Sequence, residues 1–209
     1  MIFYDCSTAP SPRRARIFLH EKQAEFETVQ IDLGSQEQLG DAFKAINPSC
    51  TVPALKLDDG TVLTQNAGIA SYLEAAYPSN PLMGRTPEEK GLVANWVAKI
   101  EIDGFQAVAE ALRNSTPRMA DRAITGEQNY AQIPELADRG LSRLVNFFDH
   151  FNEHLKGREF VTTDTFTNAD IAAVVVVDFS RIVKVKPQPH HEALVAWRQR
   201  LDERPSVGV

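Results

Sequence analysis

The fold is decided by the stretch Asn47-Pro48-Ser49-Cys50-Thr51-Val52-Pro53-Ala54-Leu55. Residues 54–57 read as a strand, and a proline directly before a strand normally weakens its pairing because proline has no N–H donor. The arrangement makes sense if the Val52–Pro53 peptide bond is cis, which would turn the backbone N–H and C=O of Val52 outward. An extended peptide can then pair with Val52 as an added strand. The alternative interpretation is an ordinary loop proline.

Around this stretch the chain alternates between strand and helix. Pro12 suits the first position of a helix, where its missing N–H does no harm, and Asp59-Gly60 suits a tight hairpin turn. The expected order is a strand at residues 2–4, a helix opening at Ser11-Pro12, a strand at 28–33, a short helix at 35–46, strands at 54–57 and 61–63, and a helix at 68–77. This order is β-α-β-α-β-β-α.

Residues 78–87 contain three prolines and a glycine and predict a linker between two domains. Beyond the linker, strand signals almost disappear. We expect helices at 87–114, 134–156, 171–177 and 191–203, with an irregular connection at 117–132. The valine pairs within 171–177 favour a strand by propensity, but Thr167 and Asp170 form a helix-capping pattern just before them, and we therefore expect a helix.

Composition limits the function. The 209 residues are 43% hydrophobic and 24% charged, as in an ordinary folded protein, and the net charge of −6 disfavours nucleic acid or an anionic membrane as a partner. Cys6 and Cys50 are too few for a disulfide scaffold or a zinc site, and His150 with His154 lacks a third metal ligand. With no secretory leader pattern and no apolar run near the roughly 20 residues of a membrane span, we expect a cytoplasmic protein.

The chain resembles the cytosolic glutathione transferases in stretches spread over both parts of the sequence. These stretches are residues 10–19, residues 47–55, Gln65-Asn66-Ala67-Gly68-Ile69-Ala70-Ser71-Tyr72-Leu73, Thr167-Asn168-Ala169-Asp170-Ile171-Ala172 and Arg204-Pro205-Ser206. They occur in the order and at the spacing of that family. The resemblance implies an α/β thioredoxin-like, glutathione-binding domain at residues 1–80, followed by an all-α helical-bundle domain at 81–209, and it favours the cis bond at Pro53.

The resemblance also implies glutathione as cosubstrate, without a metal, and assigns its binding residues. Val52, the residue before Pro53, would pair through its backbone with the cysteinyl part of glutathione. Gln65 and Asn66 would hold the γ-glutamyl end. Asn66 stands where relatives usually have serine, but its amide can still donate to a carboxylate, and the N-terminus of a helix favours an anion. Asn66 also suits a simple helix cap, and both roles can hold together.

The glycyl end of glutathione is assigned by the same resemblance to Gln38 and Thr51. The position of Gln38 belongs to the second helix of the family, near Phe43. Thr51 stands at a position that is often lysine. Because both residues are neutral, recognition of the glycyl carboxylate should rely less on charge than in many relatives.

The catalytic position departs from the family pattern. Classes that use serine or cysteine place that residue where this chain has Ala9, which carries neither a hydroxyl nor a thiol. The remaining candidates are Ser11 first, then Thr8 or Ser7, and last Tyr4, which requires a shifted alignment. A backbone amide, or a water held by the second domain, is the other possibility.

The implied activity is that of a glutathione transferase, which activates the thiol of glutathione and transfers the thiolate to a small hydrophobic electrophile. The resemblance implies a homodimer. Thioltransferase chemistry through an enzyme thiol is disfavoured, because Cys6 and Cys50 do not form a Cys-x-x-Cys pair. The alternatives are a non-catalytic glutathione-binding module, or a specialised glutathione-dependent isomerase, dehalogenase or etherase.

Overall fold

The computed structural model describes all 209 residues, which divide into two compact units. The first unit contains Met1–Asn80, Ile124–Asn129 and Val209, and the second contains Pro81–Ala123 and Tyr130–Gly208. Within the first unit, Glu127 forms an ion pair with Lys44 at 3.1 Å, which joins the segment 124–129 to the rest of the unit. None of the helices combines the length and hydropathy needed to cross a membrane.

The first unit contains a four-stranded sheet in the order β2-β1-β3-β4. Its elements are β1 (Ile2–Asp5), α1 (Pro10–Glu21), β2 (Glu27–Gln30), the 3₁₀ turn η1 (Glu37–Leu39), α2 (Asp41–Lys44), β3 (Ala54–Lys56), β4 (Val62–Leu63) and α3 (Asn66–Ala76). β1 and β2 are parallel, whereas β3 is antiparallel to both β1 and β4. The expected thioredoxin-like order is confirmed.

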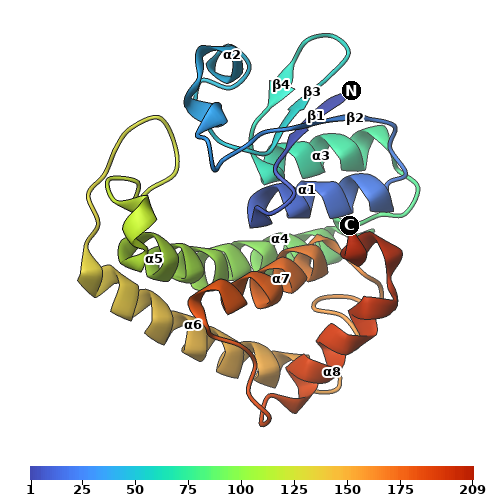
Figure 1. Cartoon of the computed structure of the whole chain (residues 1–209). Helices are drawn as coiled ribbons and strands as arrows, with labels where there is room; N and C mark the ends of the chain where they lie inside the picture. Colours follow the sequence, from blue (N-terminus) through green and yellow to red (C-terminus); the bar gives the residue numbers. More distant parts are fainter. The chain divides into compact units, whose positions relative to one another are not determined.

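Both faces of this sheet are covered. Figure 1 shows α1 and α3 side by side along one face of the sheet. Because side chains alternate along a strand, Phe3 and Tyr4 of β1 point to opposite faces. Tyr4 joins Ile31, Phe43 and Ala54 in a core cluster, with the rings of Tyr4 and Phe43 6.0 Å apart in an edge-on arrangement. α2 therefore contributes to the core on the face of Tyr4.

The segment between β2 and β3 differs from the expectation. Residues 35–46 do not form one helix, because Gln36 adopts a left-handed backbone with φ of 62° and Gly40 is extended. The result is η1 followed by the single turn α2. β2 also ends at Gln30 rather than at residue 33. Just after the strand, the Asp32 carboxylate accepts the Gly34 N–H at 2.8 Å, and this bond turns the chain away from the sheet.

The second unit is helical, as expected. Its main elements are α4 (Pro87–Lys99), the π-helical turn η2 (Ile100–Phe105), α5 (Gln106–Ser115), α6 (Pro134–Leu155), α7 (Asn168–Phe179) and α8 (Glu192–Arg200). The helical stretch predicted from residue 87 is thus present, but η2 interrupts it. Gly104 lies in η2, where a Cβ would come within 2.9 Å of Val176, so the absence of a side chain allows η2 to approach α7 closely.

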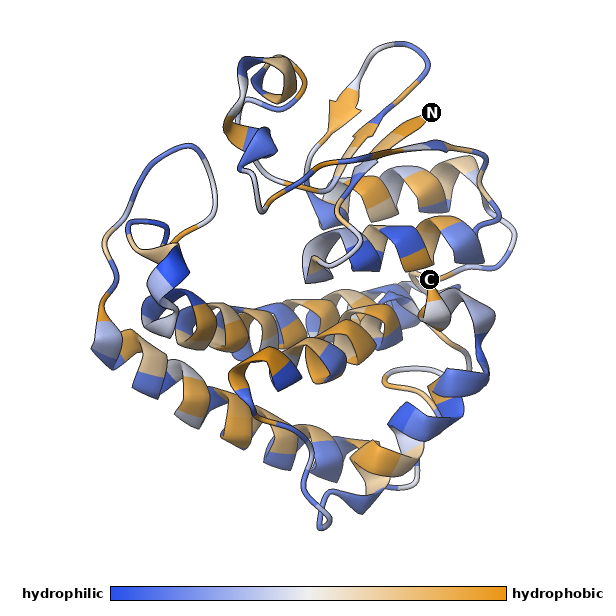
Figure 2. Ribbon diagram, viewed as in Figure 1, coloured by the Kyte–Doolittle hydropathy of each residue, from blue (hydrophilic) through white to orange (hydrophobic).

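The apolar run at residues 171–177 is a helix and not a strand. Thr167 and Asp170 form the reciprocal capping box at its start, which satisfies backbone N–H groups at the helix N-terminus. All residues from Asn168 to Val177 are buried. The apolar side chains of α7 are therefore distributed around the whole helix instead of along one face. Figure 2 shows α7 as predominantly hydrophobic, whereas α6 alternates between hydrophobic and hydrophilic residues.

A close approach between α5 and α6 depends on Gly140. A Cβ on Gly140 would lie 2.6 Å from the Ala107 carbonyl oxygen and 2.7 Å from the Ala111 nitrogen, and backbone atoms cannot give way easily. We expect Gly140→Ala to lower the free energy of unfolding by about 2 kcal/mol, because overpacking outweighs the gain in helix propensity. Gly91→Ala on α4 is the matched control, since no atom lies within 4 Å of its added Cβ, and it should stabilise by about 1 kcal/mol. Chemical denaturation measures both, and a stabilised Gly140→Ala variant would contradict the prediction.

Candidate active site

The N-terminus of α1 presents Ser11. Ala9 is the N-cap and provides no side-chain cap, and its own N–H donates to the Cys6 carbonyl at 3.0 Å. Pro10 and Pro12 have no N–H, so Ser11 carries the only backbone N–H among the first three residues of α1. Ser11 therefore brings two donors to this helix end, its backbone N–H and its hydroxyl.

Asn66 lies at the first position of α3 and contacts Ser11. The Asn66 Nδ2 donates to the Ser11 Oγ at 2.9 Å, although the two residues are 55 positions apart in the sequence. This bond occupies an acceptor site of the hydroxyl and leaves the Ser11 hydroxyl proton free to be donated elsewhere. The Oδ1 of Asn66 is buried without a hydrogen-bond partner. Gln65, the N-cap of α3, is exposed.

The loop before β3 contains the expected cis peptide bond, between Val52 and Pro53. Pro53 is buried, whereas Val52 is half-buried and packs against the core cluster of Tyr4. Asn47 fixes the loop, because its Nδ2 donates to the Thr51 carbonyl at 2.7 Å and to the Thr51 Oγ1 at 3.3 Å. The side chain of Thr51 therefore already has a partner within the loop.

The position of Gln38 differs from the sequence interpretation. Gln38 lies in the 3₁₀ turn η1 and not in the second helix, because the chain changes direction at Gln36 and Gly40. Its Oε1 is buried and has no hydrogen-bond partner. Cys50 is buried, adopts a φ of 55° and directs its Sγ to the Pro48 carbonyl, so it is not an accessible nucleophile.

The other candidate catalytic groups lie on β1 and in the turn that follows it. Thr8 and Ser7 are exposed, and the Thr8 Oγ1 lies 3.5 Å from the Sγ of the buried Cys6. Tyr4 is only 8% exposed because it belongs to the core, which makes it a poor donor to a bound ligand. The structure therefore brings Ser11 and Asn66 together and leaves Thr8 as the exposed alternative.

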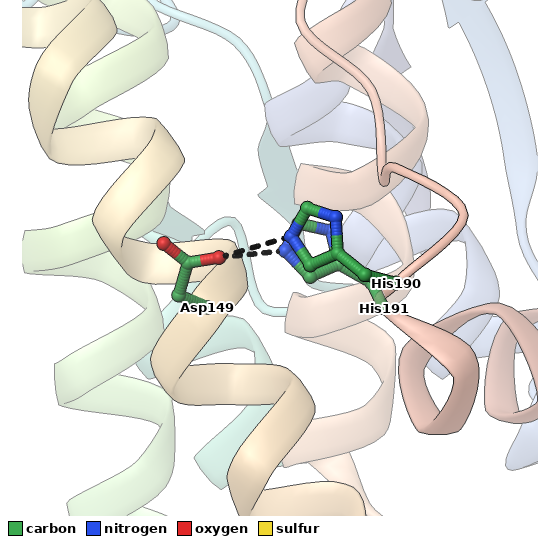
Figure 3. Close-up of side chains that lie close together, drawn as sticks. All are labelled: Asp149, His190 and His191. Atoms are coloured by element: carbon green, nitrogen blue, oxygen red, sulfur yellow. Dashed lines mark hydrogen bonds and ion pairs between the residues drawn. The ribbon is translucent and has the colours of Figure 1, made fainter.

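In the second unit, Asp149, His190 and His191 form a cluster that the sequence reasoning did not find (Figure 3). Their potential ligand atoms lie within 4.8 Å of one another. The Asp149 Oδ1 is 2.8 Å from the His191 Nε2 and 3.6 Å from the His190 Nε2. In the sequence, only the adjacency of His190 and His191 stands out, because Asp149 precedes them by about 40 residues.

The hydrogen bonds of His191 favour an anchoring role for this cluster over metal binding. The His191 Nδ1 accepts the Gln188 N–H at 2.9 Å, which places the ring proton of the neutral imidazole on Nε2, facing Asp149. A metal at Nε2 would need the opposite tautomer, with an N–H at Nδ1 facing the Gln188 N–H. The bond from His191 also lowers the pKa of the Asp149 carboxyl, as expected for a carboxylate that accepts a hydrogen bond.

His150 and His154 do not form a metal site either. The His154 Nε2 lies 2.6 Å from the Val161 carbonyl, and the imidazole stacks on the Trp96 ring with the two centroids 3.8 Å apart. Burial lowers the pKa of His154 below its ordinary value. His154 therefore packs within the helical unit, and His150 lies exposed on α6.

Two protein-family descriptions match the chain. The description "Glutathione S-transferase, N-terminal domain" matches residues 8–76, and "Glutathione S-transferase, C-terminal domain" matches residues 116–205. The first match contains Ser11, Val52, Pro53 and Asn66. The second contains the capping box at the start of α7.

Known proteins resemble the chain over its full length. Glutathione S-transferase 2 of Saccharomyces cerevisiae is 34% identical over 209 residues, which is 99% of this chain and 88% of the yeast protein. The crystal structure of Gtt2 from Saccharomyces cerevisiae superimposes with a TM-score of 0.89 at 34% identity, covering 100% of this chain and 99% of that one. A glutathione S-transferase domain-containing protein of Marinobacter aquaeolei gives a TM-score of 0.90 at 32% identity, covering 99% and 100%.

Proposed function

The chain belongs to the glutathione S-transferase family and is a glutathione S-transferase, and we propose that the first unit binds glutathione and activates its thiol. In this proposal the backbone of Val52, next to Pro53, pairs with the cysteinyl part. Gln65 and Asn66 receive the γ-glutamyl end. Gln38 and Thr51 meet the glycyl carboxylate, with Gln38 acting from the turn η1.

The observation that carries the proposal is the bond between Asn66 and Ser11. A γ-glutamyl group at the N-terminus of α3 would lie beside Asn66, whose Nδ2 is 2.9 Å from the Ser11 Oγ. The Ser11 hydroxyl proton and the Ser11 N–H are then the donors offered to the glutathione sulfur. We place Ser11 first for this role and Thr8 second, because Ala9 at the family's serine or cysteine position has no functional group.

The required stabilisation of the thiolate is modest. A free thiol titrates near pH 8.5, so only about 3% is ionised at pH 7. Lowering its pKa by about two units needs about 2.7 kcal/mol of preferential interaction with the thiolate. A helix N-terminus and one or two hydrogen bonds to the anion supply energies of this order. The two donors of Ser11 therefore suffice without a catalytic residue at Ala9.

The remaining parts of the proposal concern partners and location. The second substrate would be a small hydrophobic electrophile, attacked by the thiolate in a reaction that uses no metal. We propose that the protein works as a homodimer in the cytoplasm. The first unit would act as the glutathione-binding domain, and the helical unit would contribute specificity for the electrophile.

Thermal unfolding tests glutathione binding directly. Glutathione at about 100 times its Kd should raise the free energy of unfolding by about 2.7 kcal/mol, because it binds only the folded state. Asn66→Leu should lose most of this protection, whereas Ser71→Ala, on the same helix at an exposed position, should keep it. Conjugation of glutathione to an aryl halide is the parallel activity assay. If the parent chain shows neither protection nor conjugation, the proposal is wrong.

A further inference from the structure

Four hydrogen bonds connect Asp5, Arg16, Ser7 and Gln30 in a closed ring beside the start of α1. Asp5 ends β1, and Gln30 is its partner in the register of the parallel pair β1 and β2. The Asp5 Oδ2 accepts from the Arg16 Nη1 at 2.5 Å and from the Gln30 Nε2 at 2.9 Å. The Gln30 Oε1 accepts the Ser7 N–H at 3.0 Å, and the Arg16 Nη2 donates to the Ser7 carbonyl at 3.3 Å.

Ser7 is held on both sides of its backbone by this ring. It is a central residue of the turn that the Ala9 N–H closes on the Cys6 carbonyl at 3.0 Å. The amide of Gln30 has one orientation only, because its oxygen faces the Ser7 N–H and its NH₂ group faces the carboxylate of Asp5. The guanidinium of Arg16 is a rigid fork, so fixing one nitrogen on Asp5 also fixes the other on Ser7.

The geometry of the ion pair between Asp5 and Arg16 suits fixing the position of the Ser7 turn better than stabilising the fold. Asp5 is 1% exposed, yet only its Oδ2 is used, and its Oδ1 is buried without a partner. The Nε of Arg16 is also buried and unpaired. A bidentate pair would satisfy both carboxylate oxygens with the guanidinium fork. Here the two terminal nitrogens of the guanidinium bind Asp5 and Ser7 instead. This arrangement fixes the position of the turn but leaves the Asp5 Oδ1 and the Arg16 Nε without partners.

We propose that Asp5, Arg16 and Gln30 are positioning residues for thiol activation, which act by clamping the Ser7 peptide and hence the turn that leads into Thr8 and Ser11. This inference rests on the proposed function, in which the donors to the glutathione sulfur lie at Ser11, with Thr8 as the second candidate. None of the three clamp residues needs to touch glutathione. Their effect passes through the backbone of Ser7.

Gln30→Met tests the clamp with little risk to the fold, because Gln30 is an exposed residue at the end of an edge strand. We expect the pKa of enzyme-bound glutathione to rise by about one unit, and kcat to fall about tenfold, since small misplacements of catalytic groups have effects of this size or larger. KM for glutathione should change less than about twofold. Gln199→Met, an exposed glutamine of α8, is the matched control and should behave as the parent.

Arg16→Lys is the second variant, because lysine keeps the charge beside Asp5 but lacks the fork that reaches Ser7. It should shift the bound-thiol pKa in the same direction as Gln30→Met. The readout is the ultraviolet absorbance of the bound thiolate as a function of pH, which a merely structural role would leave unchanged. Unaltered thiol pKa and kcat in both variants of an active parent would overturn the clamp alone. A parent that neither binds nor conjugates glutathione would overturn the proposed function instead.

Discussion

Replacing Asp170 by alanine should lower the free energy of unfolding at pH 5 by about 3–5 kcal/mol, because several buried donors lose their partner and each costs about 1–3 kcal/mol when left unpaired. Asp170 is fully buried and accepts four hydrogen bonds. Its Oδ1 receives the Val161 N–H at 2.9 Å and the Trp197 Nε1 at 3.1 Å. Its Oδ2 receives the Thr167 N–H at 3.0 Å and the Thr167 hydroxyl at 3.1 Å. The variant removes the partner of the buried Val161 N–H, Thr167 N–H and Trp197 Nε1–H, whereas the Thr167 hydroxyl still lies 3.2 Å from the Thr162 Oγ1.

Asp164→Ala is the matched control, because Asp164 is 81% exposed and has only a 3.5 Å ion pair with Arg85. An exposed pair of this kind contributes about 0–1 kcal/mol, so the control should unfold almost as the parent does. Chemical denaturation followed by the fluorescence of Trp96 and Trp197 measures both variants. Equal midpoints for the two variants would show that Asp170 does not anchor the helical unit.

The cost of removing Asp170 should also depend on pH. Burial raises the pKa of Asp170 to about 6, despite the hydrogen bonds that favour its ionised form. The folded state therefore binds a proton more readily than the unfolded state, and the corresponding stability is lost as the pH rises through about 6. Between pH 5 and pH 7.5 the parent loses about 1.4 kcal/mol from this group, so the difference between parent and Asp170→Ala should shrink by that amount. A difference that grows toward pH 7.5 would contradict this sign.

The elements that the sequence predicted well are those whose signals are local. The capping pattern of Thr167 and Asp170 correctly outweighed the β-propensity of the valines that follow, because a helix start is determined within four residues. The proline before β3 left the cis bond open on local grounds, and the family resemblance favoured it; the structure confirms it. The division of residues 35–46 into η1 and α2 was not predicted, since it depends on a positive φ at Gln36 before η1 and on an extended backbone at Gly40 between η1 and α2.

The candidate site was predictable only in part for the same reason. The N-termini of α1 and α3 were identified from local patterns and family resemblance, but the contact of Ser11 with Asn66 joins positions 55 apart. The clamp residue Gln30 is 23 positions from Ser7. Neither contact has a periodic or motif signal. Both follow from the pairing of β1 with β2 and the packing of α1 against α3, which only a three-dimensional structure specifies.

Ser11→Ala should lower kcat about 10–100-fold at saturating glutathione and raise the pKa of the bound thiol, with KM for glutathione changed by less than about threefold. Removal of one preorganised donor to a developing anion usually has an effect of about 100–1,000-fold. The smaller loss is expected here because the Ser11 backbone N–H remains in the variant and continues to face the same helix end. The substitution removes only the hydroxyl that accepts from Asn66.

A companion variant, Thr8→Ala, compares the two leading candidates for this role. Thr8→Ala should leave kcat and the bound-thiol pKa close to those of the parent, since Thr8 is exposed and its hydroxyl lies 3.5 Å from the Sγ of Cys6. If Thr8→Ala loses activity and Ser11→Ala does not, the donor is Thr8. If both keep full turnover, neither the Ser11 nor the Thr8 hydroxyl is needed, and the Ser7 hydroxyl, the backbone N–H of Ser11 or a bound water is left to stabilise the thiolate. The pH dependence of thiolate absorbance separates these outcomes, because it reports on the sulfur itself and not on the electrophile.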